Sequence, residues 1–362
     1  HQKPCTHSLR DRDAGWPQTV VAMMARMAYQ INWSISKEDA KNGFNALARQ
    51  ALFDAIGEEW PEAARMFNTF YGMASPVLYR YRTADGTSAV SVMWSMEGTR
   101  MGCVLGSLGF NITIQKRLYG PLAVDYPNDP TCALTDDRIS AIQAPQRGAT
   151  QADWDDYYDD HATLLKSYME HGEDIGVCRS ASKSTLLVPP YAATPINATR
   201  KNGVKINVTK RATLVAGSPI GPDEDVARWV EERIALVVKP ACAGVIRLAQ
   251  TQPQIALRAL TDSVNTALDY IVATVPTHLI AAQILQFDEL IMDTLFKCLE
   301  PEGANVSPVS LERTARAHSL AALPVRNGGF GLTPLANKAP AAFLSTIYAA
   351  SAHPVTAGLV PT

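Results

Sequence analysis

The chain has 362 residues, of which 47% are apolar and 19% are charged, a composition typical of an ordered globular protein. This length exceeds that of one average domain, so we expect two packed units. Acidic and basic residues nearly cancel to a formal net charge of −2, which argues against strong free-standing affinity for nucleic acid. No apolar run is long enough to cross a bilayer and the first residues are polar, so we expect no membrane partner and an intracellular protein of the nucleus, the cytoplasm or an organelle.

Before residue 100 the sequence predicts a strand, a turn, a helix and a hairpin, in that order. The segment QINWSIS places alternate apolar residues on one face, as in a strand. After a tight turn at residues 41–43, apolar residues recur at helical intervals as far as Ile56. Residues 75–95 then predict a hairpin, because two alternating segments flank the pair Asp85-Gly86, which favours a tight turn.

After residue 97 the predicted elements change from mixed to helical. A segment that opens with glycines leads into a helix, and two short strands then meet at Asp136 and Asp137. Residues 151–175 have helical spacing, a loop that leads into a strand follows them, and residues 210–221 predict one further strand that ends at a Pro/Gly corner. Beyond Pro222 apolar residues recur every three or four positions, which predicts a helical unit.

Three aspartates lie next to predicted strands. Asp39 comes just after the first strand, and Asp136 and Asp137 lie at a turn between two others. Because such positions meet at one edge of a sheet, these carboxylates could share the two divalent ions, about 3.5–4 Å apart, that template-directed nucleotide addition requires. A rival pair, Asp159 and Asp160, follows two tyrosines but lies in a predicted helix with no strand before it. An Asp-Asp pair at a turn is also typical of a solvated loop, so the assignment depends on the motifs around it.

The order of these motifs resembles that of the reverse transcriptases of non-LTR retrotransposons, across nearly the whole chain. The family's first motif reads like D-x-x-N-A-F-N followed by an arginine, and it matches this sequence at Asp39, Asn42, Phe44, Asn45 and Arg49. The second motif is a glycine-rich stretch that opens a helix, and it matches at Gly98, Gly102, Leu105, Gly106 and Phe110. The third motif is an Asp-Asp pair in a hairpin, matched by Asp136 and Asp137.

This resemblance implies an α+β fold of the right-hand polymerase type. Residues 1–38 would be a remnant of the fingers or another N-terminal segment. Residues 39–221 would form a palm, with a small antiparallel sheet flanked by helices and a fingers-like hairpin at about residues 70–96. Residues 222–362 would form a helical thumb and a C-terminal extension, within which LPVRNGGFGL resembles the family signature that follows the thumb.

The resemblance also implies catalytic roles. Asp39, Asp136 and Asp137 would be catalytic residues that hold two Mg²⁺ ions. Lys183, in a loop that enters a strand, would protonate the pyrophosphate leaving group as a general acid. An ordinary solvated lysine is the alternative interpretation of Lys183.

Four further residues would contact the substrate, by the same resemblance. Phe44 would exclude the ribose 2′ hydroxyl, although a core position on the following helix is an alternative. Gly102 would lie in the stretch that backs the template and the incoming nucleotide. Arg100, which is not one of the matched positions, could contact a template phosphate, with an ordinary surface arginine as the alternative. Met101 stands where the family has glutamine, which removes an amide that would position the nucleotide.

Two functions are compatible with these patterns. The first is an RNA-directed DNA polymerase of a retroelement, with an RNA template and a DNA primer as partners. The second is a domesticated, inactive relative that serves as a scaffold in a larger protein or ribonucleoprotein assembly. The presence of all three aspartates favours the first function, whereas Met101, the near-neutral charge and the short segment before Asp39 favour the second.

Overall fold

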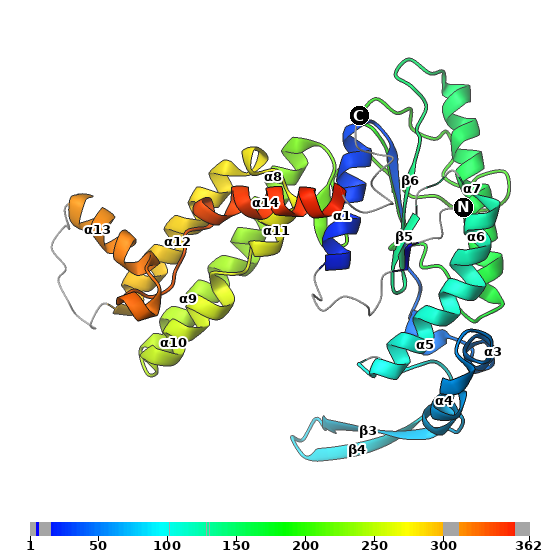
Figure 1. The fold of residues 1–362 in the computed structure, drawn as a ribbon, viewed down its shortest axis with the longest axis horizontal. Coiled ribbons are helices and arrows are strands. Elements are labelled where there is room, and N and C mark those ends of the chain that lie inside the picture. Colours follow the sequence, from blue (N-terminus) through cyan, green and yellow to red (C-terminus); the bar gives the residue numbers. More distant parts are fainter. Residues whose placement is uncertain are drawn as a thin grey trace. The chain divides into compact units, whose positions relative to one another are not determined.

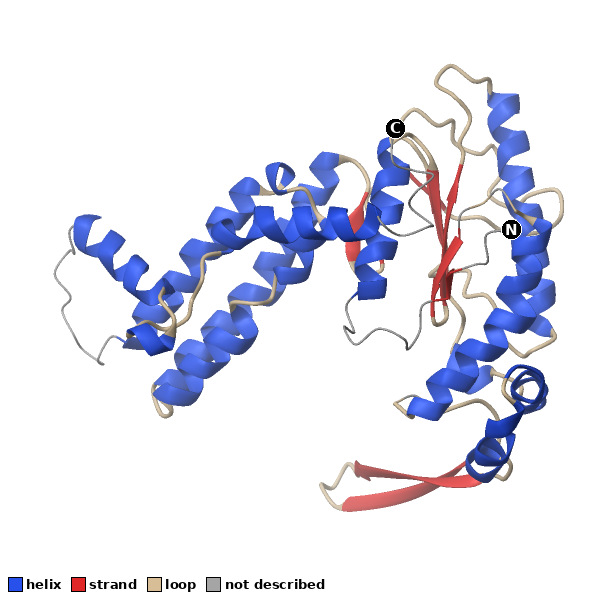
Figure 2. Cartoon of the chain, viewed as in Figure 1, coloured by secondary structure: helices blue, strands red, loops and turns tan. Residues whose placement is uncertain are grey.

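The computed structural model describes residues 5–6, 16–100, 102–127, 129, 131–299 and 311–351 (Figure 1). The chain divides into two compact units between Lys210 and Arg211. The first unit contains a sheet, a hairpin and helices, and the second is mainly helical (Figure 2). The prediction of a mixed α+β fold with a small sheet is confirmed. Within the described ranges no helix is long and apolar enough to cross a membrane.

The first unit has seven described α-helices. They are α1 (Trp16–Gln30), α2 (Gly43–Ala46), α3 (Arg49–Glu59), α4 (Ala64–Tyr71), α5 (Val104–Ile114), α6 (Gly120–Asp125) and α7 (Gln151–Glu173). A 3-10 turn at Pro61–Ala63 precedes α4, and a π-helical turn at Gln115–Tyr119 joins α5 to α6. The strands of this unit are β1 (Cys5–Thr6), β2 (Ser34–Glu38), β3 (Ser75–Arg82), β4 (Ser88–Ser95), β5 (Thr131–Leu134), β6 (Asp137–Ile142), β7 (Thr185–Leu187) and β8 (Val208–Thr209).

One six-stranded sheet forms the centre of the first unit, in the order β1-β5-β6-β2-β7-β8. The four central strands are antiparallel, and the outer strands β1 and β8 run parallel to their neighbours. In β2, Ile35 pairs with Ala141 of β6 and with Leu187 of β7. Helix α1 packs against β2 and β6 on one face of the sheet, and α7 lies on the other side (Figure 1).

The predicted hairpin at residues 75–95 is confirmed. Strands β3 and β4 pair from Ser75 with Ser95 to Arg82 with Ser88. The turn is held by Asp85, whose carboxylate accepts a hydrogen bond from the amide of Thr87 at 3.1 Å. Local turn chemistry and strand alternation therefore produced the hairpin, as expected.

The helix predicted after residues 41–43 differs from the observed one, because it is interrupted. Leu47 and Ala48 adopt extended ψ angles of 126° and 121° between α2 and α3. The break frees the end of α2 for tertiary hydrogen bonds: Leu47 O accepts from the amide of Gly98 at 2.9 Å, and the amide of Ala48 donates to Ile175 O at 2.8 Å. Partners from distant segments therefore override the helical periodicity at this point.

The second unit begins with a small hairpin, where one strand was predicted. It consists of β9 (Thr213–Val215) and β10 (Ser218–Ile220), which pair antiparallel. The helices that follow are α8 (Asp223–Arg233), α9 (Lys239–Ala249), α10 (Pro253–Ala259), α11 (Asp269–Thr274), α12 (Ala281–Leu299), α13 (Leu311–Ala322) and α14 (Leu335–Ser351). Their buried apolar faces form a separate core that includes Val230, Leu260 and Phe287. The prediction of a helical unit after Pro222 is confirmed.

Candidate functional site

The register of two strands brings two of the three aspartates together. In the β2–β6 pair, Glu38 is the partner of Arg138. Asp39 directly follows Glu38, and Asp137 directly precedes Arg138, so both aspartates come next to the last pair of this register, at the same end of the two strands. The charge of Asp39 acts on the carboxyl of Asp137, which is consistent with this placement.

The third aspartate lies in the turn that joins β5 to β6. Leu134 pairs with Asp137, so Thr135 and Asp136 form a two-residue turn. Thr135 adopts a left-handed conformation with φ 55°, and its hydroxyl donates a hydrogen bond to Asp136 Oδ1 at 2.9 Å. The tight turn therefore holds Asp136 directly next to Asp137, as the sequence predicted.

Two lysines accompany these carboxylates. Lys37 Nζ lies 3.9 Å from Asp137 Oδ2, and Lys183 Nζ lies 3.6 Å from Asp39 Oδ1. The pKa of Asp137 is raised above its usual value, chiefly because the carboxyl is buried; the nearby charges of Asp136 and Asp39 raise the pKa further, whereas Lys37 and Lys183 oppose the shift. Asp39 and Asp136 thus both lie within electrostatic range of Asp137.

The donor atoms of this cluster match a hard divalent cation. Such ions prefer carboxylate oxygens, and in the described structure the buried Asp39 Oδ1 accepts no hydrogen bond. The arrangement is nevertheless not a formed metal centre, because the described residues contain no group of three or more His, Cys, Asp or Glu side chains placed to hold one ion. The chemistry of the donors fits Mg²⁺, while the lysines occupy part of the space around them.

Lys183 lies on a turn beside the first aspartate. Its amide donates to Ser180 O at 3.1 Å, and its side chain is 68% exposed. Apart from the ion pair with Asp39, the described structure gives its ammonium group no other partner. The position suits a group that meets a bound substrate next to Asp39, and an exposed surface lysine remains the alternative.

Phe44 and its neighbour Gly43 together connect the three predicted motifs. Its ring stacks on that of Phe110, with centroids 4.4 Å apart and planes at 16°. Phe110 is fully buried, whereas Phe44 keeps part of its surface open. A Cβ atom added to Gly43 would lie 3.2 Å from Phe110 Cζ and 3.3 Å from Asp136 Cβ, so the absence of a side chain at Gly43 allows this close approach.

The glycine-rich segment is fastened to the end of α2. The amide of Gly98 donates to Leu47 O, and the amide of Thr99 donates to Phe44 O at 2.6 Å. Gly98 has φ +67°, and a Cβ atom there would lie 2.4 Å from Asn45 O, so only glycine fits. Gly102, with φ +83°, is exposed, and Met101 lies outside the described residues.

The arginine of the first motif has a structural role. Arg49 donates hydrogen bonds to backbone carbonyls at the base of the β3–β4 hairpin and in the glycine-rich segment, namely those of Tyr71, Met73, Ser95, Glu97 and Gly98. Arg100 lies over the ring of Tyr71, 5.8 Å from its centroid, and donates to the hydroxyl of Ser75. The guanidinium of Arg100 is therefore placed at the hairpin base.

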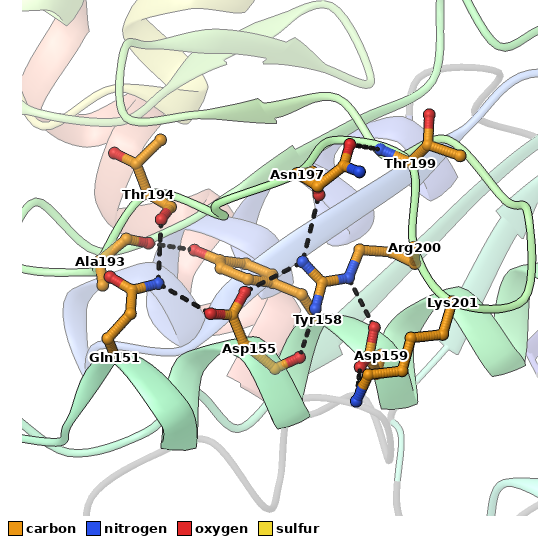
Figure 3. Close-up of polar contacts among 10 residues, drawn as sticks. All are labelled: Gln151, Asp155, Tyr158, Asp159, Ala193, Thr194, Asn197, Thr199, Arg200 and Lys201. Carbon is orange, nitrogen blue, oxygen red and sulfur yellow. Dashed lines mark hydrogen bonds and ion pairs between the residues drawn. The ribbon is translucent and has the colours of Figure 1, made fainter.

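The rival aspartate pair has a different environment. Asp159 and Asp160 lie on α7, as predicted, and Asp160 is exposed. Asp159 accepts hydrogen bonds from Arg200 Nε at 2.6 Å and forms an ion pair with Lys201 Nζ at 2.8 Å (Figure 3). Hydrogen bonds from Arg200 and Lys201 lower the pKa of Asp159 to about 2. Asp159 therefore fastens the loop that carries Arg200 and Lys201 onto α7.

The sequence interpretation missed a buried polar surface on the α7 side of the sheet. Glu38 and Arg138 are 1% and 2% exposed, and Arg179 donates to Glu38 Oε2. His161 of α7 is also buried, and burial followed by the charges of Arg138 and Arg179 lowers its pKa to about 3. Ser34, Ser36 and Glu38 alternate along the segment SISKE, so one face of this strand is polar. This alternation is the sequence signal from which polar partners on that face could have been expected.

No family model matches this chain, and no curated protein matches it. Solved structures similar to it include telomerase from Candida albicans in complex with a TWJ fragment of telomeric RNA, and telomerase from Candida tropicalis, both apo and in complex with a TWJ fragment. The sequence identities are 11%, 11% and 10%, and the TM-scores are 0.30, 0.34 and 0.34. The matches cover 77%, 95% and 96% of this chain and 47%, 55% and 53% of those chains. This chain therefore spans about half the length of the solved chains that it matches.

Proposed function

We propose that this chain carries the palm and thumb of an RNA-directed DNA polymerase of the retroelement type, with nucleotidyl transfer at Asp39, Asp136 and Asp137. The observation that carries the proposal is that Asp39 directly follows the last pair of the β2–β6 register, at the end where Asp137 begins β6 and Asp136 occupies the preceding turn. Like charges kept this close are electrostatically unfavourable, which is a cost that a purely structural turn does not need. The site and not the fold carries the activity, because many unrelated activities share a fold.

In this proposal the three aspartates would hold the divalent ions. Those ions would supply positive charge to the triphosphate and would lower the pKa of the attacking hydroxyl. The primer's 3′ oxygen forms a bond to the α-phosphorus and releases its proton to solvent, while the bond from that phosphorus to the bridging oxygen breaks. Lys183 donates a proton to the departing pyrophosphate, and the open part of the Phe44 ring would exclude a ribose 2′ hydroxyl.

A second candidate function is a non-catalytic scaffold in a protein or ribonucleoprotein assembly. The observation that favours it is the pairing of Asp137 with Lys37 and of Asp39 with Lys183. Within the described residues no three-ligand metal group is formed, so these lysines can neutralise the aspartates without an ion. In this case the aspartates would serve the fold alone.

Primer extension separates the two functions. The full natural chain is incubated with an RNA template, an annealed DNA primer, deoxynucleotides and Mg²⁺, and compared with the variants Asp136→Asn and Asp160→Asn. A polymerase loses synthesis with Asp136→Asn and keeps it with Asp160→Asn, which changes an equivalent but exposed carboxylate on α7. Extension by Asp136→Asn at the wild-type rate would overturn the catalytic assignment.

Metal binding by wild type and Asp136→Asn tests the scaffold function. Metal binding is followed without catalysis by titrating Mn²⁺ and recording its electron paramagnetic resonance signal. If the wild-type chain neither extends a primer nor depletes free Mn²⁺ more than Asp136→Asn does, the scaffold function is supported and the polymerase function is rejected.

A further inference from the structure

The segment 178–184 runs beside the first aspartate and then leaves the sheet. The amide of Ser180 donates to Asp39 O at 2.8 Å, so this part of the segment extends the sheet next to the end of β2. Before β7 resumes the pairing with β2, the chain makes a tight turn in which the amide of Lys183 donates back to Ser180 O at 3.1 Å. The turn carries the ammonium group of Lys183 to 3.6 Å from Asp39 Oδ1.

One buried hydroxyl joins this turn to Asp39. Ser184 is fully buried, and its Oγ accepts a hydrogen bond from the amide of Asp39 at 3.2 Å. The same hydroxyl donates to Ser180 O at 2.8 Å, and the amide of Ser184 donates to that oxygen at 3.0 Å. The backbone of Asp39 is therefore linked on both sides to the turn, at its amide by Ser184 and at its carbonyl by Ser180.

A buried ion pair fixes the same two backbone segments from the opposite face of the sheet. Glu38 precedes Asp39, Arg179 precedes Ser180, and the side chains of this pair are only 1% and 5% exposed. Arg179 donates from Nε to Glu38 Oε2 and from Nη1 to Lys205 O at 3.1 Å. Charge-assisted hydrogen bonds of a guanidinium have a fixed geometry, so the pair restrains the start of the turn.

We propose that Ser184 is a positioning residue that holds Lys183 beside Asp39, with the Glu38–Arg179 pair anchoring the segment on the other face. The positioning is a property of the chain itself, and its consequence for nucleotidyl transfer rests on the proposed function. Ser184 touches neither the substrate nor a reacting atom. It acts by fixing the backbone of Asp39 and of the turn that carries Lys183.

The first test measures the position of Lys183 without catalysis. Lys183 is acetylated with a limiting amount of an amine-reactive reagent, and the product is followed by mass spectrometry. Wild type, Ser184→Ala, Asp39→Asn and the double variant are compared, each at the same number of degrees below its own Tm. Because the ion pair restrains the amine, Ser184→Ala and Asp39→Asn should each raise the rate severalfold, and the double variant should be no faster than Asp39→Asn. Ser182→Ala, which changes an exposed serine of the same turn, should leave the rate at the wild-type value. An unchanged rate in Ser184→Ala would overturn the proposal whatever the enzymatic activity is.

The second test measures primer extension. Ser184→Ala should lower kcat by about tenfold or more while leaving the KM for deoxynucleotide unchanged, since a misplaced general acid affects the transfer step and not ground-state binding. Combined with Lys183→Gln, it should add no further loss. Additive losses would show that Ser184 acts through general stability, which overturns its role in transfer. If wild type does not extend primers but the acetylation coupling is found, the polymerase function fails while the positioning of Lys183 stands.

Discussion

Asp39 and Asp137 lie at the same end of the β2–β6 pair, each one residue beyond the pairing of Glu38 with Arg138. Because side chains alternate between the faces of a strand, the shift by one residue places the two aspartates and the Glu38–Arg138 pair on opposite faces of the sheet. The aspartates share the face that carries Lys37, and Glu38 and Arg138 are buried on the opposite face with Arg179. The consequences of this arrangement can be measured residue by residue.

Asp137→Asn should stabilise the metal-free protein near neutral pH. The pKa of Asp137 is raised in the folded state, mainly by burial, so the stability that this group contributes is complete below the unfolded pKa, near 3.8, and is lost as the pH rises through the folded pKa. Asparagine removes that loss because it carries no charge. Thermal unfolding in a chelating buffer should show a higher Tm for Asp137→Asn near neutral pH and no gain well below pH 3.8, whereas exposed Asp160→Asn should show no gain at either. Equal behaviour of the two variants would contradict the burial of a charged Asp137.

Arg49→Lys should loosen the β3–β4 hairpin. Lysine keeps the charge but lacks the planar fork that reaches the carbonyls of Tyr71, Ser95 and Gly98, so several acceptors lose their donor. We expect a loss of about 2–3 kcal/mol in the free energy of unfolding, measured by urea denaturation. Faster proteolysis within residues 75–95 should accompany it. Arg65→Lys, at an exposed arginine of α4, is the matched control, and an equal loss there would count against the role of Arg49.

Asp159→Asn and Asp160→Asn should differ although the residues are adjacent. Hydrogen bonds from Arg200 and Lys201 hold the pKa of Asp159 at about 2, so its stabilising contribution is present above the unfolded pKa, near 3.8, and disappears as the pH falls through about 2. Asp159→Asn should therefore lower the Tm near neutral pH, and its difference from wild type should shrink in acid. Asp160→Asn should match wild type throughout. Asp160→Asn should leave primer extension unaffected. Loss of primer extension in this variant would support Asp159 and Asp160 as the catalytic pair.

His161→Leu should flatten the acid branch of the stability curve. The folded state holds His161 neutral, with a pKa lowered to about 3 by burial first and by nearby arginines second. Stability from a depressed histidine is complete above the unfolded pKa, near 6.5, and falls as the pH decreases toward about 3. The variant removes that proton uptake, so its Tm should decline less between these limits than that of wild type. His278→Gln, an exposed histidine, should follow the wild-type curve.

Phe44→Ala tests the substrate role of the stacked pair. If the open part of the ring excludes the 2′ hydroxyl, the variant should raise the ratio of ribonucleotide to deoxynucleotide kcat/KM by about tenfold or more, which is the range that one steric contact in a pocket provides. If Phe44 serves only to cover Phe110, the variant should lose stability and leave this ratio unchanged. Single-nucleotide extension with each substrate distinguishes the two results.

Several parts of the fold follow from local sequence. The hairpin around Asp85 and the two-residue turn at Asp136 depend on neighbouring residues, because turn chemistry and strand alternation act over a few positions. The long helix α7 has its own Thr150 cap, whose hydroxyl accepts from the amide of Asp153 at 3.2 Å. For this reason Asp159 and Asp160 could be assigned to a helix before any tertiary contact was known.

Tertiary structure alone decided which distant groups meet. Nothing near Arg49 in the sequence specifies the carbonyls of the hairpin as its partners, and helical periodicity does not reveal the break at Ala48 that frees Leu47 O for Gly98. Likewise the sequence presents Lys183 as one lysine in a loop, and its position beside Asp39 arises from β7 pairing with β2 and from the hydroxyl of buried Ser184. Local sequence determines turns and helices because their hydrogen bonds close within a few residues, whereas side-chain partners are fixed only when strands from distant segments adopt one register.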